Sequence, residues 1–156
     1  MSPEPVLVLL VEDNDDHAEL LKRTLREATD LVRIVHARDG EAALDYLGLS
    51  GASTGREANE IPGLVLLDLR LPRIDGLDVL RRIKEARSLR PVPVVVLTTS
   101  SASTDISRAY AFHANSYLTK PVSFDHFNRL MLTLSRYWTV WNTRPGAHRA
   151  APVLPA

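Results

Sequence analysis

The sequence of 156 residues contains no cysteine. This absence excludes disulfide bonds, thiolate metal sites and a cysteine nucleophile. The chain also lacks an excess of charge, because 19 lysine and arginine residues balance 19 aspartate and glutamate residues. A net charge of zero gives no electrostatic reason to expect DNA, RNA or an anionic membrane surface as the main partner.

Long hydrophobic runs are missing as well. The apolar run Val6–Val11 is too short to cross a bilayer, and no signal sequence precedes it. These features predict a cytoplasmic protein that does not bind a membrane. The apolar share of 45% and the charged share of 24% are typical of a globular domain, and the length allows one sizeable core.

Five segments have the character of β-strands. Three are short apolar runs rich in β-branched residues, at 6–11, 64–67 and 92–97. Such runs are typical of parallel strands that are buried on both faces. Weaker strand candidates lie at 31–35 and 115–119.

Helical patterns lie between these strands. Helices are predicted to begin after Asn14, at Asp39-Gly40 and at Asp75-Gly76, and to span 103–113 and 123 to about 141. Strands and helices that alternate in this way predict an α/β fold. We expect a doubly wound, five-stranded parallel sheet in the flavodoxin-like order 2-1-3-4-5, flanked by five helices.

The predicted domain organisation is simple. A single domain covers residues 1–142, with a flexible loop at about 48–60 where Gly, Ser, Thr and Asn follow no periodicity. Residues 143–156 form a proline-containing tail without a core of its own. No effector domain is expected, because only one helix and this tail follow Pro121.

Chemically active side chains follow four of the predicted strands. They are Glu12 and Asp13, Asp68, Thr98, and Lys120. The carboxyl ends of parallel strands meet at one edge of a sheet, which is where such folds bind ligands. Three carboxylates close together need a compensating cation, and oxygen ligands without histidine or cysteine favour Mg²⁺. We therefore predict a Mg²⁺ site that also holds a phosphoryl group.

Each of these residues also has a purely structural interpretation. Glu12 and Asp13 could cap a helix, Thr98 could be an ordinary strand residue, and a lysine before a proline is usually solvated. Asp68 is harder to explain in this way, because an unpaired charge at the rim of a buried strand is costly. A cis bond before Pro121 would turn Lys120 into the site, and a trans bond is the alternative.

Five ordered segments resemble a known family, the receiver domains of bacterial two-component response regulators. They are residues 11–14 (Val-Glu-Asp-Asn), 68–72 (Asp-Leu-Arg-Leu-Pro), 75–76 (Asp-Gly), 98–100 (Thr-Thr-Ser) and 117–121 (Tyr-Leu-Thr-Lys-Pro). The long loop before residue 68, the 98–100 run and the aromatic-rich end resemble the single-domain regulators that partner bacterial phytochromes.

The resemblance implies a role for each site residue. Asp68 would be the phosphoacceptor. Asp13, Asp68 and the backbone carbonyl of Arg70 would bind Mg²⁺, and Glu12 would act largely through bound water. The side chain of Arg70 would face the route of attacking water.

It also implies a switch. Thr98 would donate a hydrogen bond to the phosphoryl group, and Lys120 would pair with it. Tyr117 matches the aromatic residue that changes rotamer when Thr98 moves toward the phosphate, and an ordinary half-buried strand tyrosine is the alternative. Ser100 lies at a second position that faces attacking water.

The implied function is that of a stand-alone response regulator, a signalling switch rather than an enzyme. Its donor would be the phosphohistidine of a sensor histidine kinase, such as a bacteriophytochrome. Its output would be a downstream protein or a histidine phosphotransfer partner. Late aromatic residues, namely Tyr137, Trp138 and Trp141, are predicted to form a homodimer or partner interface, with packing inside the molecule as the alternative.

Three other functions compete with this one. A haloacid dehalogenase-type phosphohydrolase would use Asp13 and Asp15, but it needs a cap domain or a longer chain. A flavodoxin-like binding module needs a phosphate-binding loop where this chain has carboxylates. A receiver that signals without phosphorylation is the third.

Overall fold

The computed structural model describes residues 4–51 and 59–145. It contains a five-stranded sheet in the order β2-β1-β3-β4-β5, and all four strand pairs are parallel. The strands are β1 Val6–Val11, β2 Val32–Ala37, β3 Leu64–Leu67, β4 Val94–Thr98 and β5 Ser116–Thr119. The predicted fold class and strand order are therefore confirmed.

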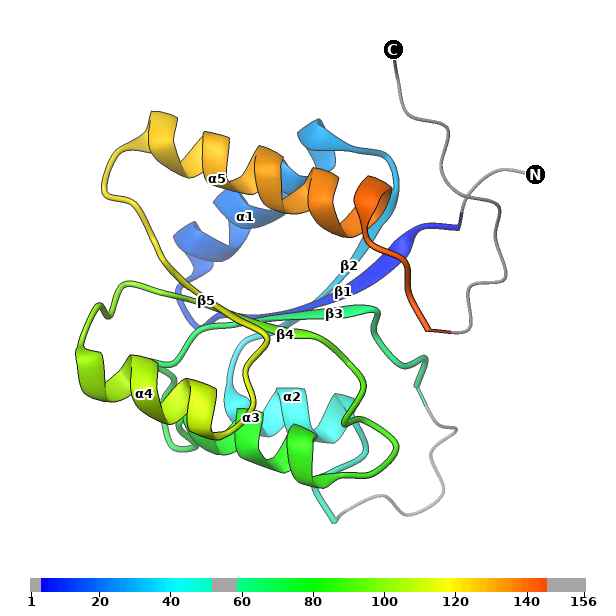
Figure 1. Ribbon diagram of the computed structural model, residues 1–156, viewed down its shortest axis with the longest axis vertical. Coiled ribbons are helices and arrows are strands. Elements are labelled where there is room, and N and C mark those ends of the chain that lie inside the picture. The colour runs from blue at the N-terminus through cyan, green and yellow to red at the C-terminus, as the bar shows by residue number, and fades with distance from the viewer. Residues whose placement is uncertain (1–3, 52–58, 146–156) are drawn as a thin grey trace.

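Five α-helices connect or follow the strands. They are α1 Asp15–Ala28, α2 Gly40–Tyr46, α3 Gly76–Glu85, α4 Ser103–Ala111 and α5 Phe124–Arg136. Helices α1 and α5 lie on one face of the sheet, and α2, α3 and α4 lie on the other (Figure 1). The sheet is thus the middle of three layers, as expected for a doubly wound fold.

Three helices begin at capping residues in the loops that follow β1, β2 and β3. The side chains of Asn14, Asp39 and Asp75 accept hydrogen bonds from first-turn backbone N–H groups at 3.0, 2.7 and 3.0 Å. These bonds satisfy donors that a helix N-terminus otherwise leaves unpaired. The predicted helix starts are confirmed at all three positions.

The core has one apolar cluster on each face of the sheet. Helices α2, α3 and α4 pack against one face around Leu67, Leu80 and Val96. Helices α1 and α5 pack against the other around Leu66 and Met131. Every residue of β1, β3 and β4 is buried, which agrees with the continuous apolar runs in the sequence.

The end of the last helix differs from the prediction. We expected one helix from residue 123 to about 141, but the α-helix ends at Arg136, and Tyr137–Trp141 form a π-helical turn. The backbone N–H of Asn142 donates to the carbonyl of Tyr137, five residues back, at 2.7 Å. Apolar spacing in a sequence does not distinguish this turn from an α-helix, because both place similar residues inward.

Two predictions fall largely outside the described residues. Residues 52–58 of the expected flexible loop and residues 146–156 of the expected tail are not described. None of the helices in 4–51 and 59–145 has the length and apolar character that a bilayer span requires.

Gly76 brings α3 against the end of β3. A Cβ atom at this position would lie 2.3 Å from the carbonyl oxygen of Asp68 and 2.6 Å from Cα of Leu69. Backbone atoms cannot yield to that contact, so only glycine fits here. The first turn of α3 therefore holds the backbone of Asp68 in place.

Candidate functional site

The four strand ends named from the sequence meet at one edge of the sheet. Val11 pairs with Leu67, so Glu12 and Asp68 leave β1 and β3 at the same level. Strands β4 and β5 also end together, and Lys120 follows β5 directly. The loops that follow β1, β3, β4 and β5 lie at the same end of the molecule (Figure 1).

Three carboxylates and one ammonium group form the centre of this edge. Glu12, Asp13 and Asp68 each offer a carboxylate oxygen, and these oxygens lie within 4.8 Å of one another. Lys120 Nζ donates to Glu12 Oε2 at 2.6 Å and to Asp68 Oδ2 at 3.2 Å. Three negative charges and one positive charge leave the cluster with two uncompensated negative charges.

The pKa of Glu12 shows the effect of burial and of the neighbouring charges. Burial, together with the negative charge of Asp68, raises the pKa of the Glu12 carboxyl to about 7, against the opposing effect of Lys120. Its side chain is only 1% exposed. A bound divalent cation would relieve the same imbalance, and an all-oxygen ligand set suits a hard ion.

Arg70 contributes its backbone to the site, and its side chain reaches α4. The backbone N–H of Arg70 donates to Asp68 Oδ1 at 3.1 Å, which brings the Arg70 peptide next to the carboxylates. The guanidinium Nη2 donates to Asp105 Oδ2 of α4 at 2.8 Å. The side chain therefore has a specific partner beside the site.

Thr98 is the last residue of β4, and Tyr117 is the second residue of β5. Thr98 is completely buried, and its Oγ1 accepts a hydrogen bond from the Ser100 N–H at 3.5 Å. The Tyr117 hydroxyl donates to the Ser100 carbonyl at 2.8 Å, so its ring is turned toward the β4–α4 loop. Burial raises the pKa of Tyr117. Both side chains thus contact the same loop.

Two histidines join the site without having been predicted. His17 Nδ1 lies 3.2 Å from Lys120 Nζ, and His36 Nε2 lies 2.8 Å from the Glu12 carbonyl oxygen. His36 stands near the end of β2, so the strand-end rule could have indicated it. His17 follows the Asn14 cap inside α1, and nothing in the sequence pattern indicates its direction. The bond before Pro121 is trans.

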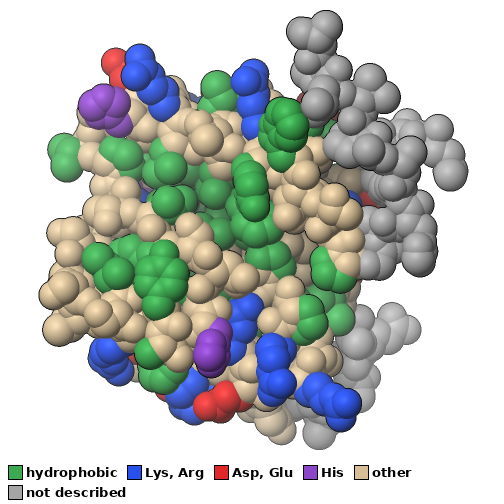
Figure 2. All heavy atoms as spheres, in the orientation of Figure 1, with side chains coloured by type: hydrophobic (Ala, Val, Ile, Leu, Met, Phe, Trp, Pro, Cys, Tyr) green, Lys and Arg blue, Asp and Glu red, His purple; other side chains and the backbone are tan. Residues whose placement is uncertain are grey.

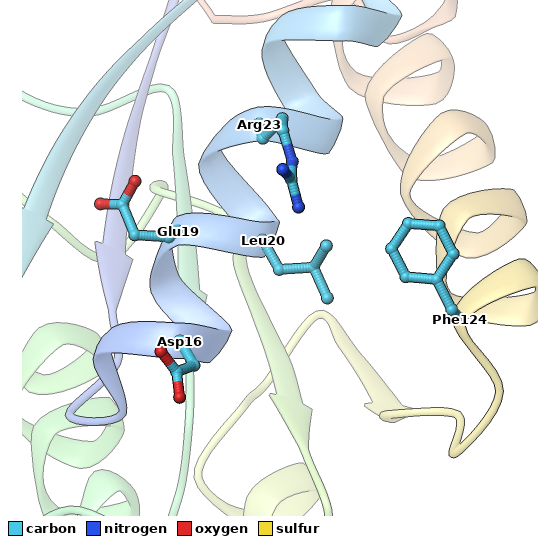
Figure 3. A pocket seen from close by; sticks show the side chains of 5 residues that line it. All are labelled: Asp16, Glu19, Leu20, Arg23 and Phe124. Carbon is cyan, nitrogen blue, oxygen red and sulfur yellow. The ribbon is translucent and has the colours of Figure 1, made fainter.

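A shallow groove lies beside this edge, between α1 and α5. It is lined by Asp16, Glu19, Leu20, Arg23 and Phe124. The side chains of Leu20 and Phe124 face each other across the groove, with Arg23 next to them (Figure 3). Phe124 is 55% exposed although it is aromatic. The groove therefore has apolar side chains on both sides and further charged lining residues from α1.

The late aromatic residues are not equally exposed. Tyr137 is 53% exposed and Trp141 is 59% exposed. Trp138 is partly buried and packs against the core under α5, with the Tyr137 ring edge-on at 5.1 Å between ring centroids.

Residues 8–131 match the response regulator receiver domain family. The chain belongs to that family. A receiver domain is a signalling switch rather than a classical enzyme, and a histidine kinase phosphorylates it. This receiver domain carries an acidic metal site formed by Glu12, Asp13 and Asp68.

Two relatives and the solved structure of one of them place the domain more closely. The probable methanogenesis regulatory protein FilR2 of Methanothrix harundinacea is 49% identical over 143 residues, which are 92% of this chain and 90% of FilR2. Response regulator Rcp1 of Synechocystis sp. is 36% identical over 146 residues, 94% of this chain and 97% of Rcp1. The Mn²⁺-bound structure of Rcp1 superposes with a TM-score of 0.83 and covers 91% of this chain and 100% of its own.

A third relative is also known from its structure. The phosphorylated cyanobacterial phytochrome response regulator RcpA is 33% identical, with a TM-score of 0.80 over 91% of this chain and 99% of its own. The receiver domain is thus close to phytochrome-associated regulators, which implies a sensor histidine kinase as its partner.

Proposed function

We propose that Asp68 is the phosphoacceptor of this receiver domain. An oxygen of its carboxylate attacks the phosphorus of a phosphohistidine. The new O–P bond forms as the P–N bond breaks, and the imidazole nitrogen keeps the electron pair. The observation that carries this proposal is the position of Asp68 Oδ2, 3.2 Å from Lys120 Nζ and inside the carboxylate cluster.

The proposed metal is Mg²⁺, held by Asp13, Asp68, the carbonyl of Arg70 and, through water, Glu12. The ligand set supports this choice, since it consists of oxygen atoms and carries excess negative charge. When bound, Mg²⁺ would neutralise charge on the phosphoryl oxygens.

The other residues position and sense the phosphoryl group. Lys120 pairs with a phosphoryl oxygen once Asp68 is modified, because a phosphoryl group adds about −1.5 to −2 charge. Thr98 donates a hydrogen bond to a second oxygen. This bond draws the β4–α4 loop inward, and Tyr117 follows through its contact with Ser100.

The proposed phosphodonor is a phytochrome-type sensor histidine kinase. The relatives Rcp1 and RcpA support this assignment. The kinase must bring its phosphohistidine to the sheet edge, and the groove between α1 and α5 lies beside that edge. The exposed Phe124 and the partly buried Leu20 offer an apolar contact for a kinase helix.

Output is proposed to leave through the surface formed by α4, β5 and α5, to a downstream protein or a histidine phosphotransfer partner. Hydrophobic side chains gather over this face (Figure 2). The exposed large hydrophobic residues of α4, α5 and the segments after β5 and α5 are Tyr110, Val122, Phe124, Leu132, Tyr137 and Trp141. Tyr137, Trp138 and Trp141 are proposed to contribute to a homodimer interface, since exposed aromatic residues favour interfaces.

Phosphorylation by a small donor tests the proposed function. The protein is incubated with Mg²⁺ and acetyl phosphate, and the adduct is measured by intact mass. We expect a Mg²⁺-dependent, base-labile adduct that is absent from Asp68→Asn. Turnover that survives Asp68→Asn but is lost in Asp13→Asn would instead indicate a phosphohydrolase, and no adduct in the wild type would indicate a receiver that signals unphosphorylated.

A further inference from the structure

A polar cluster lies beside the carboxylate site and is not part of it. Its centre is Asp105, the third residue of α4, whose side chain is only 15% exposed. Its Oδ2 accepts a hydrogen bond from Arg70 Nη2 at 2.8 Å and another from Ser100 Oγ at 2.6 Å. One carboxylate oxygen thus binds two residues that come from different loops.

These two residues flank the reactive group. Arg70 follows Asp68 by two residues and donates its backbone N–H to Asp68 Oδ1. Ser100 follows Thr98 by two residues, and its hydroxyl also accepts from the Ala102 N–H at 3.3 Å. Asp105 therefore ties the β3–α3 loop to the β4–α4 loop on the α4 side of Asp68.

The contact is more than a surface ion pair. Arg70 is 65% exposed and would move freely without a partner, whereas Asp105 is largely buried. The Ser100 hydroxyl, bonded at 2.6 Å, adds a short charge-assisted hydrogen bond. Arg70, Ser100 and Asp105 thus form a bonded set of three side chains on the α4 side of the site.

We propose that Asp105 is a positioning residue that slows hydrolysis of the phosphoryl group on Asp68, an inference that rests on the proposed function. In hydrolysis, a water oxygen attacks phosphorus, the bond between phosphorus and the Asp68 oxygen breaks, and the carboxylate leaves with the electron pair. The attacking water releases its proton to solvent. By holding Arg70 and Ser100 together, Asp105 narrows the approach of that water.

Decay of the phosphorylated protein tests the role of Asp105. Wild type, Asp105→Ala and Asp105→Asn are labelled with acetyl phosphate and Mg²⁺, the donor is removed, and loss of label is followed. We expect Asp105→Ala to lose its label about two- to fivefold faster, the effect of losing about 0.5–1 kcal/mol of positioning energy on a rate. Asp105→Asn keeps the size of the side chain and should give a smaller increase.

A matched control separates this role from the general effect of an aspartate in the first turn of a helix. Asp78 is the third residue of α3 and also pairs with an arginine, Arg81, but on its own helix. Asp78→Ala should therefore decay at the wild-type rate. Arg70→Ala should decay as fast as Asp105→Ala, and the double variant should be no faster, because both changes break the same contact.

Mg²⁺ affinity, measured by calorimetry, gives a second readout that should stay unchanged in Asp105→Ala. A wild-type decay rate in both Asp105 variants, a slower rate, or a parallel loss of Mg²⁺ affinity would overturn the role of Asp105. If the wild type takes up no label at all, the proposed function itself fails, and the role of Asp105 falls with it.

Discussion

Glu12 shows how strongly the site alters single residues. The sequence places it after a buried strand, and the fold then surrounds it with Asp68 and Lys120. Its carboxyl is thereby removed from water and kept near another carboxylate. The ordinary pKa of 4.5 rises to about 7 as a result.

This shift predicts how stability depends on pH in the metal-free protein. Because the folded-state pKa lies above the unfolded value, the protonated carboxyl contributes stability that is fully present below pH 4.5 and lost as the pH rises through about 7. Glu12→Gln stays neutral and does not lose this contribution. Its free energy of unfolding minus that of the wild type should therefore grow between these pH values. Urea unfolding with EDTA measures it, and a difference independent of pH would contradict the prediction.

At the scale of elements, a buried lysine joins α3 to β4 and β5. Lys84 Nζ donates to the carbonyls of Arg90 and Val92 and to Asn115 Oδ1, at 3.1, 2.7 and 3.0 Å. Burial lowers the pKa of Lys84, since it penalises the charged form. Asn115 Oδ1 also accepts from the Val94 N–H at 2.8 Å. This connection lies at the edge of the sheet opposite the site.

Loss of the shared acceptor should destabilise this junction. Asn115→Ala is expected to lower the free energy of unfolding by about 1–3 kcal/mol, since two donors lose a partner. The cost should be smaller in a Lys84→Met background, where one of those donors is already gone. Asn59→Ala, which removes one exposed hydrogen bond to Tyr46, serves as the control. Equal costs for Asn115→Ala and Asn59→Ala in denaturant titrations would argue against this junction.

At the scale of the whole molecule, the C-terminal aromatic residues bear on whether two chains form a dimer. Tyr137 and Trp141 leave large rings in solvent directly after α5. Hydrophobic side chains also gather on one face of the molecule (Figure 2). A protein that exposes such a surface commonly buries it against a partner.

Removal of these rings should separate a dimer into single chains. Tyr137→Ser combined with Trp141→Ser is expected to halve the native mass measured by light scattering, while Trp138 is kept because it packs against the core. Ile61→Ser removes an equally exposed apolar side chain before β3 and should leave the mass unchanged. A wild type that is already a single chain at high concentration would refute the dimer.

The sequence by itself determined the layers of this protein and the identity of its site. Apolar runs define buried strands, and strands that alternate with helices form a parallel sheet. A parallel sheet brings Asp68 and Lys120 to one edge whatever the conformation of the loops. The resemblance to receiver domains rests on those same residues.

Only the tertiary structure decided how the side chains at that edge pair. Lys120 binds Glu12 as well as Asp68, His17 joins them, and Arg70 turns to Asp105 instead of the carboxylates. Those directions depend on loop conformation and on contacts between segments far apart in the chain, which local patterns do not carry. For the same reason the π-helical turn after Arg136 appeared only in the fold, since its spacing of apolar residues resembles that of an α-helix.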